Sequence, residues 1–292
     1  MQTMKRARYF EKPLFPVLTL GILIVILYYS VIRDLVGDWV IDENYSHGFL
    51  IPLVSAFFVW RQRDVLRKIR WSSHNLGLVV LVTGLLMFMA ANVAVEYFTM
   101  RFSLLVVIGG LILYLGGKDL AGRLVFPLLY LVFMIPVPYV LYYTISFPLE
   151  ILASRWTAGV LSILGIPIFR EGNILYLENI TLQVIDACSG LRSLISLSAL
   201  SAAMAYMTQK TVLKGAILFL ASAPVAIAAN ILRLSVTAVL ASIYGEQLAQ
   251  GFLHKFSGMV VFIFAVISLS LIGGLLRWLS FKKNIGSFAA CC

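Results

Sequence analysis

Residues 257–276 read SGMVVFIFAVISLSLIGGLL, a stretch without one charged side chain. A helix of about 20 mostly apolar residues is long enough to cross a membrane. A second stretch, residues 212–232, reads VLKGAILFLASAPVAIAANIL and carries a single lysine near its start. Apolar runs of this length are typical of membrane spans rather than of soluble cores, so they indicate a chain whose main solvent is lipid.

The composition of the whole chain agrees with this reading. Of 292 residues, 61% are apolar and 12% are charged, whereas soluble domains have about 45–50% and about 25%. These values exclude a cytosolic enzyme, a disordered chain and a secreted disulfide scaffold. The net charge is +10, but lysine and arginine form short clusters between the apolar runs. We therefore attribute the charge to membrane topology and anionic headgroups, and expect no nucleic-acid partner.

The apolar pattern predicts an all-α polytopic membrane protein, forming a single membrane domain over residues 1–292. About eight transmembrane helices are expected, at 14–32, 48–60, 76–95, 102–117, 124–145, 191–207, 212–232 and 257–276. The stretch 146–165 carries Glu150 and Arg155 and is expected to be an interfacial or partly embedded helix. Six spans with two interfacial helices is the alternative.

The distribution of basic residues predicts the orientation. With eight spans and a cytoplasmic N-terminus, every inside loop is basic, as the positive-inside rule requires. Both termini are then cytoplasmic, and the segment 146–190 lies at the outer face. The basic N-terminus and the stretch 14–32 are interpreted as a retained anchor, because no small-residue cleavage site follows.

Residues 165–190, GIPIFREGNILYLENITLQVIDACSG, contain two strand-like runs. Gly172-Asn173 is a turn signal, and Asn179-Ile180 offers a second turn. The pattern predicts a small extracytoplasmic β-hairpin that leads to the start of the next helix.

Cys188 falls at that helix start. Backbone N–H groups and the helix dipole stabilise a thiolate there. Ser189 is suited to cap the helix, Gly190 allows a substrate to approach, and Arg192 adds positive charge. The alternative is a small, inert membrane cysteine. Cys291 and Cys292 end the chain, so no disulfide framework and no metal spacing exist.

Two further residues are predicted at the same membrane face. Arg233 follows an apolar stretch and shares a helix face with Asn230, three residues earlier. A membrane arginine faces a cavity or partner, or else extends to the headgroups. His254 precedes the last span and has a side chain suited to proton transfer, although a solvated interfacial histidine is the alternative.

Together these residues favour nucleophilic catalysis. Cys188 supplies a nucleophile, Arg233 a cation for the oxyanion and His254 a proton donor. His47 is a supporting candidate on the same face. A metal held by His47 and His254 has no support from spacing, so neither a metal nor a cofactor is expected.

The motifs ACSGLRSL (187–194), N-x-x-R (230–233) and His254, with YSHGF (45–49) and REGN (170–173), resemble the exosortase family over roughly residues 40–280. This resemblance implies a bacterial inner-membrane cysteine transpeptidase with its active site at the periplasmic face. It implies catalytic roles for Cys188, Arg233 and His254, with Asn230, His47, Arg192, Ser189 and Gly190 supporting catalysis or binding substrate. The implied partners are the Pro-Glu-Pro-type C-terminal signal and transmembrane helix of exported proteins, often encoded near exopolysaccharide genes. The acceptor nucleophile stays open.

Two other classes remain open from sequence. A transporter or lipid flippase explains the spans and Arg233, but no internal repeat is found. A structural subunit of a polysaccharide export machine is the second.

Overall fold

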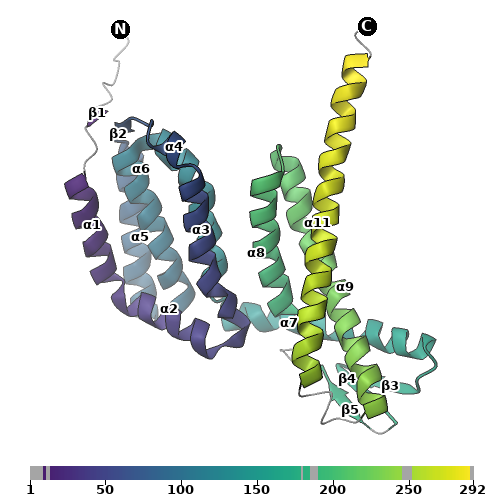
Figure 1. The fold of residues 1–292 in the computed structure, drawn as a ribbon. Coiled ribbons are helices and arrows are strands. Elements are labelled where there is room, and N and C mark those ends of the chain that lie inside the picture. Colours follow the sequence, from purple (N-terminus) through teal and green to yellow (C-terminus); the bar gives the residue numbers. More distant parts are fainter. Residues whose placement is uncertain (1–8, 11–13, 179, 185–189, 245–251, 290–292) are drawn as a thin grey trace. The chain divides into compact units, whose positions relative to one another are not determined.

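A computed structural model of the chain describes residues 9–10, 14–178, 180–184, 190–244 and 252–289, with side chains over 15–178, 180–184, 190–243 and 258–279. The described chain is mostly helical (Figure 1). It divides into two compact units, Met1–Pro138 and Tyr139–Cys292, and each is described by itself. A single membrane domain over 1–292 stays a prediction.

The first unit is formed mainly by helices. Its elements in chain order are β1 (Tyr9–Phe10), α1 (Leu14–Leu27), α2 (Tyr29–Ile41), the 3-10 helix η1 (Glu43–Phe49), α3 (Leu50–Arg61), α4 (Arg63–Leu66), β2 (Trp71–Ser72), α5 (Asn75–Ala94), α6 (Tyr97–Tyr130) and the 3-10 helix η2 (Leu131–Met134). The axes of α1 and α2 differ by 64°. Glycines let α5 and α6 pack closely: a Cβ on Gly110 would lie 2.5 Å from the backbone nitrogen of Leu81.

Helix α6 is not straight. Gly117 has φ +78° and ψ −175°, which is not helical, and the chain turns there. Before this glycine, Arg101 forms an ion pair with Asp38 of α2 at 2.7 Å. After it, the carbonyl oxygen of Met134 accepts a hydrogen bond of 2.9 Å from the Trp39 indole. Because neighbouring residues of α2 contact both ends, the segment runs out and back.

In its described residues, the second unit contains four helices. They are joined by one small sheet (Figure 1). Its elements are α7 (Tyr139–Ile163), β3 (Ile168–Glu171), β4 (Ile174–Leu177), β5 (Thr181–Gln183), α8 (Leu191–Thr208), α9 (Val212–Tyr244) and α11 (Phe252–Ala289). Helices α8, α9 and α11 share one apolar core, which includes Leu197, Leu218, Ala229, Val261, Ala265 and Leu269.

The strands form an antiparallel sheet in the order β3-β4-β5. Glu171 pairs with Ile174 across the first turn, where Gly172 has φ +60°. The region predicted as a hairpin therefore contains three strands rather than two. Its position outside the membrane stays a prediction.

The prediction of about eight spans is not confirmed. Among the described residues, the helices long and apolar enough to cross a membrane are Asn75–Ala94, Tyr97–Met134, Val212–Ile243 and Gly258–Leu279, with the bent pair α1–α2 as a possible fifth. Helix α3 has 12 residues, about 18 Å, which is shorter than a bilayer core of about 30 Å. The serine-rich α8 does not qualify either. The predicted span 102–117 falls on α6 up to Gly117, where the chain turns, whereas the predicted span 124–145 covers the end of α6, η2 and the first residues of α7.

Candidate functional site

The sheet packs against the half of α9 that follows Arg233. Leu175 of β4 and Val184 lie in one buried cluster with Leu161 of α7 and Ala238 of α9. Each of these four side chains is almost fully buried. The cluster fixes the sheet, α7 and α9 together, so the chain leaves the sheet at Val184 beside this part of α9.

Gly190 is where the chain enters α8, and it lies directly against α9. Its backbone has φ +85°, in the left-handed region that favours glycine. A Cβ at this position would come within 2.9 Å of the side-chain Cγ of Asn230. The N-terminus of α8 and Asn230 are therefore in contact.

Asn230 and Arg233 are both buried polar residues of α9, with 3% and 9% of their surfaces exposed. The Oδ1 atom of Asn230 and the Nε atom of Arg233 are fully enclosed. Burial of an arginine on an apolar helix is costly unless the guanidinium serves a partner or a function. The alternative in which Arg233 extends to the headgroups is not what this structure shows.

Helix α11 runs antiparallel to α9, so the contacts between the two helices show which part of α9 lies beside His254. At one end, Lys214 donates a hydrogen bond of 2.7 Å to the carbonyl oxygen of Leu276, and Gly273 lies against Leu218. When this pairing is continued along the two antiparallel helices, Arg233 lies opposite residues 257–258. His254 is three or four positions away, which is about one helical turn. The backbone of His254 thus lies near the level of Arg233.

The structure describes only part of the predicted site. Gly190, Asn230 and Arg233 lie in one region, and Arg192 is in the first turn of α8. Cys188 and Ser189 lie outside the described residues, as does the side chain of His254. His47 belongs to the first unit. Within the part of the chain that is described, no group of three or more His, Cys, Asp or Glu side chains is arranged to hold a metal ion.

Replacing Gly190 with alanine is expected to destabilise the site. An alanine in the left-handed region costs about 1–2 kcal/mol, and its Cβ would press on Asn230. We expect the midpoint of thermal unfolding in detergent to fall by several degrees. Gly165 is the matched control, because it also has positive φ but a Cβ added there would meet no atom within 4 Å. Equal losses at both positions would show that backbone strain alone, and not the contact with Asn230, is responsible.

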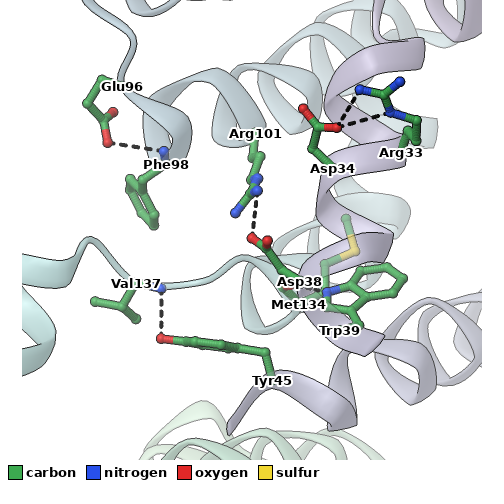
Figure 2. A network of polar contacts seen from close by, with 10 residues as sticks. All are labelled: Arg33, Asp34, Asp38, Trp39, Tyr45, Glu96, Phe98, Arg101, Met134 and Val137. Carbon is green, nitrogen blue, oxygen red and sulfur yellow. Dashed lines mark hydrogen bonds and ion pairs between the residues drawn. The ribbon is translucent and has the colours of Figure 1, made fainter. Parts of the chain in front are cut away.

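In the first unit, His47 lies on η1, next to a polar and aromatic network that includes Tyr45 (Figure 2 shows Tyr45 and its bond to Val137). The rings of His47 and Tyr45 are 6.3 Å apart. The hydroxyl oxygen of Tyr45 accepts a hydrogen bond of 3.2 Å from the backbone nitrogen of Val137. Burial, and then the nearby carboxylates of Asp42 and Asp38, raise the pKa of Tyr45, so this hydroxyl stays protonated at neutral pH.

Glu96 caps the start of α6 in the same network (Figure 2). Burial disfavours its ionised form, but hydrogen bonds from Thr99 at 2.6 Å and from Phe98 at 3.0 Å outweigh this effect, with help from Arg101. The pKa of Glu96 is therefore below its ordinary value. A lowered pKa means that this carboxylate contributes stability at neutral pH, which is lost as the pH falls through that pKa.

The ion pair between Arg101 and Asp38 is expected to stabilise the first unit. Arg101 is 6% exposed, so Asp38→Ala leaves a buried cation without its carboxylate. Breaking a buried pair costs about 3–5 kcal/mol, and the partial exposure of Asp38 reduces this to about 1–3 kcal/mol. Asp34→Ala is the control, because its pair with Arg33 is exposed and contributes at most about 1 kcal/mol. If the two variants unfold at the same temperature, the buried pair is not stabilising.

Sequence reasoning missed one buried polar cluster beside the sheet. The Ser146 hydroxyl donates to Oε1 of Glu150 at 2.8 Å, and the Asn173 side-chain amide donates to Oε2 at 3.2 Å. The same amide donates to the carbonyl oxygen of Val184 at 2.8 Å. Glu150 was interpreted only as a charge on an interfacial helix. Its spacing of four residues from Ser146 and from Ser154, all on one face of α7, was the available signal.

The comparisons with known proteins identify the family of the chain. No curated protein and no solved structure matches the chain. A family model described as transmembrane exosortase matches residues 39–271, which include the Gly190, Asn230 and Arg233 positions described above. Because this match covers well over half of the sequence, the chain belongs to the transmembrane exosortase family.

Proposed function

We infer that this protein is a membrane-embedded cysteine transpeptidase that cleaves C-terminal sorting signals from exported proteins. Its family is one of membrane cysteine transpeptidases. The proposed substrates carry a Pro-Glu-Pro-type signal followed by a transmembrane helix and a basic tail. The proposed location is the bacterial inner membrane with the active site at the periplasmic face, where such a signal would lie beside its own span. A role in sorting proteins to an exopolysaccharide matrix follows from the same resemblance.

In the proposed mechanism, the Cys188 thiolate attacks the carbonyl carbon of the scissile peptide bond. The carbonyl electrons move to oxygen, and Arg233 stabilises this oxyanion. Collapse of the tetrahedral intermediate breaks the C–N bond, and the departing amine takes a proton from His254. The product is a thioester on Cys188. His254 then accepts a proton from the incoming acceptor, which attacks the thioester and releases the thiolate.

One observation supports this proposal most strongly. The backbone of Gly190, two residues after Cys188, contacts Asn230, and Arg233 is one helical turn further along α9. A buried guanidinium in a water-poor site stabilises a developing oxyanion far better than in water, by about 3–4 kcal/mol for one donor. Asn230 is proposed to orient Arg233 or to donate a further hydrogen bond. Arg192, Ser189 and His47 are proposed supporting residues.

The acceptor decides the outcome of the second step. Water gives a protease, whereas an amine or a lipid-linked group gives a transpeptidase. Each of these acceptors would deliver its proton to the same imidazole, that of His254.

Mass spectrometry of a substrate's mature C-terminus tests the function. Membranes containing this chain and a substrate with a Pro-Glu-Pro signal are compared with membranes containing the Cys188→Ala variant. We expect a shortened substrate only with the unaltered chain, and the mass of its new C-terminus identifies any attached group. Intact substrate in both samples, or equal cleavage in both, would refute the proposed function.

A further inference from the structure

We propose that Glu150 and Asn173 are positioning residues, which hold the chain at Val184 so that the segment carrying Cys188 leaves the sheet in a reactive arrangement. The proposal rests on the proposed function, because it assigns the pair a role in thiol catalysis. Neither residue was among those implied by the sequence motifs for direct catalysis.

The contacts form one chain from α7 to the end of the sheet. Ser146 donates to Glu150 at 2.8 Å, and Glu150 accepts from the Asn173 amide at 3.2 Å. The same Asn173 nitrogen donates to the Val184 carbonyl oxygen at 2.8 Å. The Asn173 carbonyl oxygen accepts from the Val184 backbone nitrogen at 2.9 Å. Both backbone polar groups of Val184 are therefore bound by Asn173.

Glu150 fixes the orientation of the Asn173 amide. A side-chain amide has two N–H hydrogens on one nitrogen. With one hydrogen directed at the Glu150 carboxyl, the other is directed at Val184. Glu150 is 6% exposed, and Ser146 and Val184 are at most 1% exposed, so water competes little for these hydrogen bonds.

The other end of the segment is also anchored. Residues 185–189 connect Val184 to Gly190, whose backbone lies against Asn230 of α9. The segment carrying Cys188 thus begins at a residue tied to α7 and ends at a residue packed on α9. A displacement of about 1 Å at a reacting group costs about 10²-fold in rate, so loosening either anchor is expected to impair catalysis.

The test measures both substrate cleavage and thiol reactivity. All variants are full-length proteins in detergent and also carry Cys291→Ser and Cys292→Ser, so that only Cys188 can be labelled. The tested variants are Asn173→Ala, Glu150→Ala, Glu150→Gln and the double variant Glu150→Ala/Asn173→Ala. Iodoacetamide labelling of Cys188 is followed against pH, and substrate cleavage is followed separately. Glu171→Ala is the matched control, because Glu171 is an exposed carboxylate of the same sheet. Thermal unfolding confirms that each variant is folded.

We expect Asn173→Ala and Glu150→Ala to reduce kcat by about 10- to 100-fold, with the double variant no worse than the more impaired single variant. Glu150→Gln keeps a carbonyl oxygen facing Asn173, so its kcat should stay within about threefold of the parent. The pH profile of Cys188 labelling should move toward that of an ordinary thiol in both alanine variants. The proposal would be overturned if Glu150→Gln lowered kcat as much as Glu150→Ala does. It would also be overturned if the losses of kcat in the two single variants multiplied in the double variant.

The labelling experiment separates this proposal from the proposed function. If Cys188→Ala still cleaves substrate, the proposed function fails, and the pair then has no catalysis to support. If Cys188 is required but its labelling profile is the same in Asn173→Ala as in the parent, the positioning role alone fails.

Discussion

Cys188→Ala is expected to abolish substrate cleavage, with a loss of at least about 10⁴-fold in kcat. Removing a covalent nucleophile eliminates the thioester route entirely, and losses of about 10⁶-fold are known for such residues. Cys188→Ser should also be nearly inactive, because a hydroxyl is far less ionised than a thiol at neutral pH. The measurement is the amount of shortened substrate in membranes containing equal quantities of each variant.

The control is the double variant Cys291→Ser/Cys292→Ser, which leaves Cys188 as the only cysteine of the sequence. It should cleave substrate at the parent rate. A transporter or structural subunit would keep its activity without Cys188, so substantial processing by Cys188→Ala would favour those classes.

Arg233→Gln is expected to give the second largest loss, about 10²- to 10³-fold in kcat. Glutamine retains a hydrogen-bond donor of moderate length but lacks the charge that stabilises the oxyanion in a water-poor site. Arg233→Lys keeps a positive charge, on a compact ammonium group, but loses the planar guanidinium with its several N–H donors. We therefore expect it to be more active than Arg233→Gln and less active than the parent. KM should change less than kcat, because the oxyanion exists only after attack on the carbonyl.

Arg155→Gln is the matched control for Arg233→Gln. Arg155 lies on α7 in the same unit, but its side chain is exposed. It should retain activity within about twofold and unfold at the parent temperature. An Arg233→Gln variant that is folded and fully active would contradict the oxyanion role, and one that is unfolded would be replaced in this comparison by Arg233→Lys.

The sequence predicted the helical membrane class because long apolar runs leave few alternatives, and it placed the starts of α8 and α9 at the residues where these helices begin. It divided α7 between the predicted span 124–145 and the interfacial helix 146–165. The predicted end of the span on α9 was wrong, because the prediction stops at residue 232 and the helix continues to Tyr244. Arg233, just beyond the predicted span, was expected to face a cavity or partner, or else to extend to the headgroups. In the structure it is buried within the helix, and apolar residues such as Leu234 and Ala238 continue the packing beyond it.

The first unit shows where the predicted count of eight spans is not confirmed. The sequence placed a break between the predicted spans 102–117 and 124–145, and the chain does turn at Gly117. The turn is a single non-helical glycine within one helical segment rather than a loop, because the backbone angles of Gly117 allow it. Conversely, the run 48–60 was expected to cross the membrane, but its first residues form the 3-10 helix η1, where Gly48 packs on the Trp39 indole. Only the twelve residues of α3 remain as regular helix.

For the site, the structure brings Gly190 against Asn230 of the N-x-x-R motif, and a single site that also includes Cys188 and His254 stays a prediction. The contact of Gly190 with Asn230 depends on a left-handed glycine meeting a distant helix, and no local pattern specifies such a meeting. Glu150 was missed because a lone carboxylate in an apolar helix usually indicates an interface. Its buried partners, Ser146 and Asn173, are brought to it by the fold.

The central claim is a covalent bond between substrate and Cys188, and intact-mass spectrometry of the protein tests it most directly. Purified protein in lipid nanodiscs is mixed with a substrate bearing a Pro-Glu-Pro signal and quenched in acid within seconds. The account predicts a mass increase equal to the N-terminal product less one water, removable by hydroxylamine and mapped to the peptide containing Cys188. His254→Ala is included, and its adduct should form or decay more slowly. Substrate cleavage with the protein mass unchanged throughout, or an adduct on another residue, would contradict the account.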